Sequence, residues 1–235
     1  MATGNLVQYS GGPGELLKAQ LQIVGGNPAL VGGGDYDLTK AILQQMQTWP
    51  APDIASIALQ PTGCTASTLD RSSTAFNQTT AIGATGVLQL CAIFVPFNTI
   101  VNNINFVTGS TAGVTMTHQW AVLCDNNRNL LANTADLTNG AIGANAVFTW
   151  PVAAIASGAA TSFTTTYGGL YYVGLLVTAA TIPTLMGTSD AANTIKNIAP
   201  ILVGGSTSSL TTPSPYPTQY AALTATTSPF YSYLT

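Results

Sequence analysis

Residues 115–124 read Thr-Met-Thr-His-Gln-Trp-Ala-Val-Leu-Cys, and this stretch decides the fold class. A period of two is typical of a β-strand, because successive side chains of a strand point to opposite faces. The alternation breaks at Ala121 and Leu123, as expected where a second layer covers the strand. The residues that the alternation places on one face are Met116, His118, Trp120, Val122 and Cys124.

An Asn-rich turn follows this strand. Residues 125–129 have turn composition, and the chain from Leu130 onward is expected to return as a partner strand, forming a hairpin. Many short strands separated by Gly, Asn and Pro favour a mainly β protein, an antiparallel sandwich or barrel. The further strands are predicted at residues 86–97, 99–108, 146–150, 162–167, 170–178 and 230–234.

The N-terminal part has a different character. The first 34 residues are rich in glycine and predict an arm with little core of its own, which orders mainly on docking because glycine makes ordering costly. The apolar spacing between Asp37 and Trp49 predicts one amphipathic helix, which Pro50 ends. A short helix does not fold alone, so we expect it to dock on a body or on a neighbouring subunit. The predicted division is residues 1–55 for arm and docking helix and residues 56–235 for the sandwich.

The C-terminal part combines two compositions. Residues 204–217, Gly-Gly-Ser-Thr-Ser-Ser-Leu-Thr-Thr-Pro-Ser-Pro-Tyr-Pro, have the composition of a linker. Residues 220–235 are rich in aromatic and β-branched residues, which predicts a final strand that returns to the sheet.

The chain carries very little charge. Only 6% of its 235 residues are charged and the net charge is −3, against roughly 25% charged residues in an average soluble protein. The few basic residues are scattered, so no patch that tracks phosphates is expected and nucleic-acid binding is set aside. Residues 72–124 and 137–189 contain no charged residue. Soluble monomers usually rely on interspersed surface charges, so we infer that an assembly covers much of this surface.

Motifs of catalysis are missing from the sequence. The single histidine, His118, is interpreted as a hydrogen-bonded core residue rather than as a catalytic base or ligand, and no G-x-S-x-G motif accompanies it. Cys64, Cys91 and Cys124 form no C-x-x-C pair, so the two in apolar strands, Cys91 and Cys124, are expected to be reduced core thiols. We expect no enzymatic activity, no metal and no cofactor. Neither a secretory signal nor a membrane span is predicted.

Four large aromatic side chains on predicted strands are the candidate ligand-binding residues. If they lined a groove, their rings could stack on sugars, whereas core burial is the more common use of such residues. The four are Trp120, Trp150, Tyr171 and Tyr172.

Four stretches carry a resemblance to a known family. They are Phe94-Val95-Pro96-Phe97 followed by Ile104-Asn105-Phe106; residues 118–123 with the Asn-rich turn and Leu130-Leu131-Ala132; residues 169–174 with Pro183-Thr184-Leu185; and residues 210–213 with residues 230–234. From about Thr62 onward the chain resembles the β-sandwich domain of virion structural proteins of actinobacterial tailed phages, the minor tail proteins.

The resemblance implies a jelly-roll-like sandwich on the virion, often a homotrimer, behind an N-terminal segment that anchors it to other virion proteins. Such domains are suspected of touching host cell-wall glycans, and the family has no shared catalytic residues. We therefore expect a minor tail or baseplate component. The alternatives are a capsid decoration or head-fibre protein and, from another class, a carbohydrate-binding module. The chain lacks the collagen-like or coiled-coil shaft of many phage fibres.

Overall fold

The computed structural model describes residues 21–24, 27–30, 61–69, 79–81, 85–188, 197–206, 210–216, 218–226 and 228–235. The chain divides into two units, residues 1–58 and residues 59–235, and each is described by itself. The division lies close to the boundary expected between residues 55 and 56.

The first unit contains a hairpin. β1 (Leu21–Val24) pairs antiparallel with β2 (Asn27–Leu30), and Leu21 lies opposite Leu30. No strand was predicted in this glycine-rich segment. The helix expected between Asp37 and Trp49 and its docking contact lie outside the described residues.

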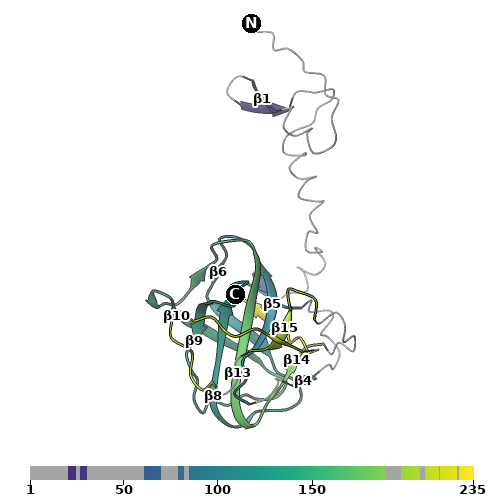
Figure 1. The fold of residues 1–235 in the computed structure, drawn as a ribbon, viewed down its shortest axis with the longest axis vertical. Helices are drawn as coiled ribbons and strands as arrows, with labels where there is room; N and C mark the ends of the chain where they lie inside the picture. The colour runs from purple at the N-terminus through teal and green to yellow at the C-terminus, as the bar shows by residue number, and fades with distance from the viewer. Residues whose placement is uncertain are drawn as a thin grey trace. The chain divides into compact units, whose positions relative to one another are not determined.

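The second unit, called the body below, is built on one path of hydrogen-bonded antiparallel strands, which passes at β10 from a first layer to a second (Figure 1). We call these two layers the first and the second sheet. The first sheet has the strand order β16-β15-β5-β13-β8-β9-β10. Its strands are β16 (Thr224–Ala225), β15 (Val203–Gly205), β5 (Gln89–Val95), β13 (Gly169–Thr181), β8 (Val114–Cys124), β9 (Leu130–Thr134) and β10 (Val147–Ile155).

The second sheet continues from β10 in the order β10-β7-β17-β3. Its further strands are β7 (Asn103–Val107), β17 (Ser232–Leu234) and β3 (Ala66–Ser67). The returning C-terminal strand is thereby confirmed: β17 pairs with both β7 and β3. Short pairs complete the body: β11 (Gly158–Ala159) with β10, β12 (Phe163–Thr164) with β6 (Ile100–Val101), and β14 (Thr184–Met186) with β4 (Thr79–Ala81).

β10 belongs to both sheets. Residues 147–151 pair with β7, whereas residues 152–155 pair with β9, and the register shifts between Val152 and Ala154. The strand was expected to end at Trp150, before Pro151. It continues because a bulge bends a strand around a corner, where the missing N–H of a proline is tolerated.

The inner core lies between the two sheets. Side chains of β5, β8 and β13 on the first sheet face side chains of β7, β10 and β17. Examples are Ile93, Leu123, Tyr171 and Leu175 from the first group and Ile104, Phe106, Trp150 and Leu234 from the second. The body is therefore a mainly β, antiparallel sandwich, as predicted. The jelly-roll connectivity stays a prediction.

An outer core covers the opposite face of the first sheet. Leu90, Trp120 and Leu176 lie there beneath residues 210–216 and 218–223, which we call the strap. The flanking β15 and β16 belong to the first sheet itself. The strap contributes Leu210, Tyr216, Tyr220 and Leu223 to this core. A segment of linker composition therefore forms a third layer. The second layer inferred from Ala121 and Leu123 is real, because β8 is buried on both faces.

The prediction that placed Met116 on the face of Trp120 is wrong. Met116 belongs to the inner core, whereas Trp120 belongs to the outer core. The register between β8 and β13 shifts at Thr178 and Ala179, so that His118 lies opposite Thr178 but Met116 opposite Ala179. One extra residue in a strand exchanges the faces of all residues beyond it.

Helical structure is nearly missing from the described ranges. Within them, no helix has the length and apolarity that crossing a membrane requires.

Candidate functional site

The four aromatic candidates are all buried. Trp120, Trp150, Tyr171 and Tyr172 have at most 4% of their surface exposed. The structure also separates them, because Trp150 and Tyr171 lie in the inner core and Trp120 and Tyr172 in the outer core. Their rings are closed to a sugar in this structure, which favours the core alternative at these positions.

The polar atoms of these residues are used inside the fold. The indole Nε1 of Trp120 donates to the carbonyl oxygen of Thr211 at 3.0 Å, and the Tyr172 hydroxyl donates to that of Ile201 at 2.8 Å. The first bond attaches the strap to the first sheet, and the second holds the residues that lead into β15. The Tyr171 hydroxyl donates to the carbonyl oxygen of Tyr167 at 2.9 Å, and the two rings stack.

His118 is paired with a carboxylate. Its Nδ1 donates to Oδ2 of Asp136 at 2.7 Å, and the side chains of His118 and Asp136 are 25% and 14% exposed. Oδ1 of Asp136 accepts from the backbone N–H of Gln119 at 3.1 Å. The histidine is therefore hydrogen-bonded, as predicted, but it is partly exposed.

Gln119, the residue after His118, also holds the loop that follows β9 and contains Asp136. Its Nε2 donates to the carbonyl oxygens of Leu137 and Gly140 at 2.9 and 2.8 Å. The backbone N–H of Leu137 donates in turn to the carbonyl oxygen of Gln119 at 2.9 Å. Both Asp136 and Gln119 thus attach the loop after β9 to β8. An imidazole that a carboxylate holds in place, as Asp136 holds His118, can act as a general base. In the described body, however, no hydroxyl or thiol donates a hydrogen bond to the His118 ring.

Cysteines and metal-ligating groups are spread out. Cys91 and Cys124 are buried thiols in opposite cores, as predicted, and Cys64 is half-buried. Within the described ranges, no three His, Cys, Asp or Glu residues lie close enough to hold a metal ion.

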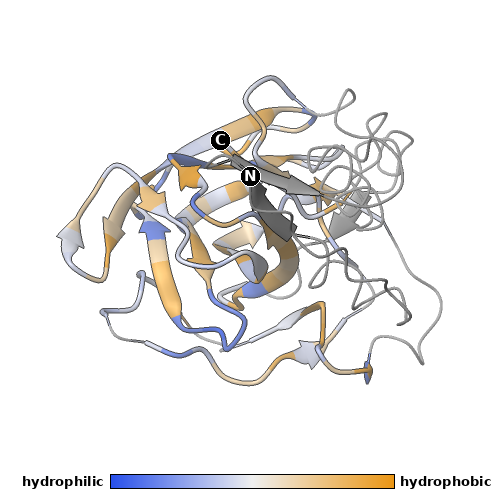
Figure 2. Ribbon diagram, turned by 90° about the horizontal axis from the view of Figure 1, so that it is seen from above, coloured by the Kyte–Doolittle hydropathy of each residue, from blue (hydrophilic) through white to orange (hydrophobic). Residues whose placement is uncertain are grey.

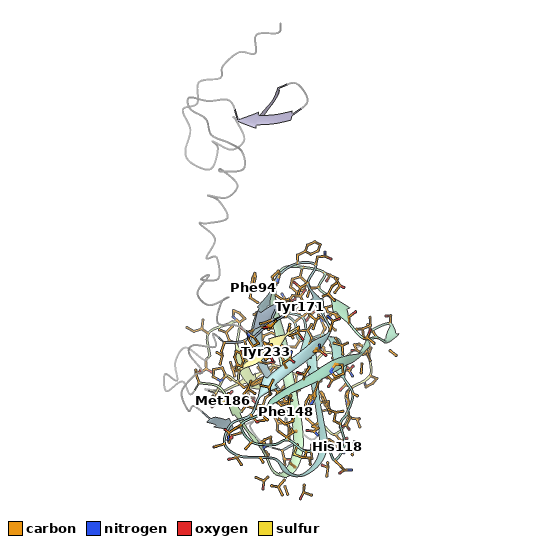
Figure 3. The ribbon with its side chains drawn as sticks, turned by 180° about the vertical axis from the view of Figure 1, so that it is seen from behind. Phe94, His118, Phe148, Tyr171, Met186 and Tyr233 are labelled. Carbon is orange, nitrogen blue, oxygen red and sulfur yellow. The ribbon has the colours of Figure 1, made fainter. Side chains whose placement is uncertain are left out.

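Exposed apolar side chains gather at one end of the body. Phe94, Phe97, Ile100 and Leu202 are 64%, 68%, 56% and 54% exposed, and we call them the apolar rim. Phe94 lies opposite Leu170 on one side of β5, while the carbonyl oxygen of Leu202 accepts from Ala92 N–H on the other side. Phe97 lies beside Gly168, where a Cβ would come within 3.0 Å of its backbone nitrogen. Figure 3 shows Phe94 and His118 at opposite ends of the body.

Buried Thr165 holds the turn of the rim in place. Its hydroxyl donates to the carbonyl oxygen of Pro96 at 2.7 Å and accepts from the N–H of Thr99 at 2.8 Å. Its backbone N–H donates to the carbonyl oxygen of Thr99 at 2.9 Å, and its carbonyl oxygen accepts from Asn98 at 3.1 Å. These four hydrogen bonds hold the turn of residues 96–99 against Thr165.

Two features escaped the sequence analysis. Asp136 is the only charged residue between Arg128 and Asp190, which singles it out, but its pairing with His118 depends on the path of a loop. The rim could have been suspected from Phe94 and Phe97 on either side of Pro96, because large apolar side chains are uncommon beside a turn.

Comparisons with known proteins found no match: no family model, no curated protein and no solved structure matches the chain.

Proposed function

We propose that this chain is a non-enzymatic structural protein of a bacteriophage virion, a minor tail or baseplate component. Its bodies associate with copies of themselves, as a homotrimer, and the N-terminal residues attach them to other virion proteins. The body has jelly-roll-like connectivity in this proposal. No cofactor takes part, and a host cell-wall glycan is a further contact of the assembled particle.

The observation that carries the proposal is the lack of charge on the body. Within its described ranges, the charged side chains are Asp125, Arg128 and Asp136, with His118 as the one further titratable base. Exposed positions are mostly Thr, Ser, Asn, Gly and Ala. In Figure 2, most loops are pale and deep blue is restricted to short segments. Charged residues normally cover about a quarter to a third of a soluble monomer's surface.

Such a surface suits a protein that is covered by its neighbours in an assembly. Identical copies repel each other least where each copy has few charges of one sign to bring together. The resemblance of residues 62–235 to minor tail proteins supports a phage tail as the assembly. The stretches that carry this resemblance lie in strands of the body: residues 94–97 at the end of β5, residues 118–123 in β8 and residues 169–174 in β13.

The solution mass of the purified chain tests the proposal. We expect light scattering to give a trimer, both for the whole chain and for a version without the first 55 residues, with circular dichroism as the check of folding. A folded, soluble monomer at every concentration would contradict the proposed assembly.

The place on the particle needs a second measurement. We expect gold-labelled antibodies against the body to mark the tail in electron micrographs of particles from the source of this sequence. Labelling of the head would favour the decoration alternative, and unlabelled particles would exclude a virion role.

A further inference from the structure

The loop between β9 and β10 contains the one Asn-Gly step of the sequence, Asn139-Gly140. Asn-Gly is the dipeptide most prone to deamidation, because glycine has no Cβ to hinder the approach of its own backbone nitrogen to the preceding side chain. Asn139 is exposed, and no hydrogen bond to its side chain is found among the residues that the structure describes. Its amide group is therefore open to this reaction.

The reaction needs only water. The backbone nitrogen of Gly140 gives up its proton and bonds to Cγ of Asn139, the bond from Cγ to the side-chain nitrogen breaks, and that nitrogen leaves with the proton as ammonia. The product is a five-membered succinimide. Water then adds to one of its two carbonyl groups and opens the ring, which leaves an aspartyl or an isoaspartyl residue in place of Asn139. Nothing is oxidised or reduced.

The native turn holds the attacking nitrogen away from this reaction. The N–H of Gly140 donates to the carbonyl oxygen of Leu137 at 3.0 Å and closes a four-residue turn. Asn139 is the third residue of the turn and has a φ of 61°, a conformation that asparagine tolerates better than most residues. The nitrogen can attack only after it has left the Leu137 carbonyl and the backbone has rotated. Deamidation therefore requires the turn to open.

Gln119 keeps the turn closed at both ends. Its Nε2 donates to the carbonyl oxygens of Leu137 and Gly140, the first and the last residue of the turn. Gln119 is only 1% exposed, so water competes little for these bonds. A Cβ at Gly140 would collide with Nε2 of Gln119 and break both contacts. The packing that makes glycine necessary at position 140 thus also creates the reactive step.

We propose that Asn139-Gly140 is a deamidation site that the Gln119 amide keeps closed, so that the chain is modified there only when the turn opens. The rate of modification then follows the fraction of molecules with an open turn. An isoaspartyl product is irreversible for the loop, because it adds one carbon atom to the backbone and moves Gly140 away from Gln119. The inference does not depend on the proposed function.

The first test compares the folded full chain with the same chain unfolded in urea, both in one mildly alkaline buffer. Mass spectrometry of peptic fragments measures the conversion of amide to carboxyl at each asparagine, and a protein-isoaspartate methyltransferase labels the isoaspartyl product. We expect Asn139 to react fastest of all asparagines in the unfolded chain, and at least about 10-fold more slowly in the folded chain. Equal rates at Asn139 in both states would overturn the proposal.

The second test removes the Gln119 amide. Gln119→Leu keeps a side chain of similar size but loses both hydrogen bonds, so Asn139 should react about 10-fold faster than in the folded wild type. Thr165→Val is the matched control, because it removes two hydrogen bonds from the turn that contains Asn98. Asn98 is also exposed, with a φ of 59°, but Thr99 follows it. We expect this control to change the rate at neither asparagine.

Asp136→Ala keeps the test decisive if Gln119→Leu does not fold, which circular dichroism checks. It removes the two hydrogen bonds from Asp136 to β8 and leaves Gln119 intact, so a smaller acceleration at Asn139 is expected. An unchanged rate at Asn139 in a folded Gln119→Leu chain would overturn the role of Gln119. If that chain is unfolded, an unchanged rate in folded Asp136→Ala would overturn the dependence on loop opening. An equal acceleration in Thr165→Val would overturn it as well.

Discussion

The two core cysteines are fully buried, whereas the third, Cys64, is half-buried. Burial raises the pKa of the Cys91 thiol to about 12, and burial together with the Asp125 charge raises that of Cys124 as well. Only the thiolate attacks a disulfide reagent, so neither should react in the native state near neutral pH. Burial raises the pKa of the Cys64 thiol as well, but this side chain is only half-buried, so a reagent reaches it and it should react first.

We therefore expect one reactive thiol in the native chain and three after unfolding in guanidinium, measured with a chromogenic disulfide. Cys64→Ser should remove the native reaction altogether. Three thiols of equal rate in the native state would contradict the burial of Cys91 and Cys124.

Gly174 shows how tightly the outer core is filled. A Cβ at this position would lie 2.6 Å from both Leu90 Cδ2 and Val122 Cγ2. Since Val122 is stiff and sits in a strand, Gly174→Ala should destabilise the body by about 1–3 kcal/mol. Gly143→Ala is the control, because a Cβ there meets nothing within 4 Å and should change little. Urea denaturation measures both, and equal midpoints would contradict the prediction.

At the scale of elements, the strap is attached to the sheet by a few side chains. The Tyr216 hydroxyl lies 2.8 Å from Oδ1 of Asn133 and 2.9 Å from the carbonyl oxygen of Ala154. Tyr216→Phe leaves both oxygens without this partner, which should cost about 1–3 kcal/mol. We expect hydrogen exchange by mass spectrometry to become faster in the strap, at residues 210–223, and to stay unchanged in β13. Equal acceleration of both would mean that the strap and the sandwich unfold together.

The elements also show what the sequence could predict. Alternation of side chains is a local property, so β8, β13 and their neighbours were found with nearly correct ends. The face of β8 on which Met116 lies was predicted wrongly, because the bulge opposite Thr178 depends on the partner strand. The strap looked like a linker because its Ser, Thr and Pro residues outnumber the four apolar side chains that anchor it. The pairing of Asp136 with His118 depends on how a loop crosses β8, which no local pattern contains.

At the scale of the whole molecule, the unfolding free energy of the charge-poor body should decrease at alkaline pH. Burial is the main cause that raises the pKa of both Tyr167 and Tyr220 to about 12, from an ordinary 10.0, and Cys91 rises to about 12 from 9.0. The unfolded chain therefore loses these protons first. Stability is fully present below pH 9 and falls as the pH rises toward about 12.

Urea denaturation at several pH values measures this dependence. We expect the unfolding free energy to fall steadily between pH 9 and about 12. An unfolding free energy that stays constant over this range would contradict the burial of Tyr167 and Tyr220.

The pairing of β17 with β3 has a consequence for how the protein is made. The hydroxyl of Thr65 donates to the carbonyl oxygen of Leu234, 169 positions further along the chain. The second sheet thus stays without its β17 strand until the ribosome has released residue 234, and the newly made β3 and β7 each wait with one edge unpaired. Contacts between such distant residues also slow folding. We expect nascent chains of this protein to need protection from a chaperone for most of their synthesis.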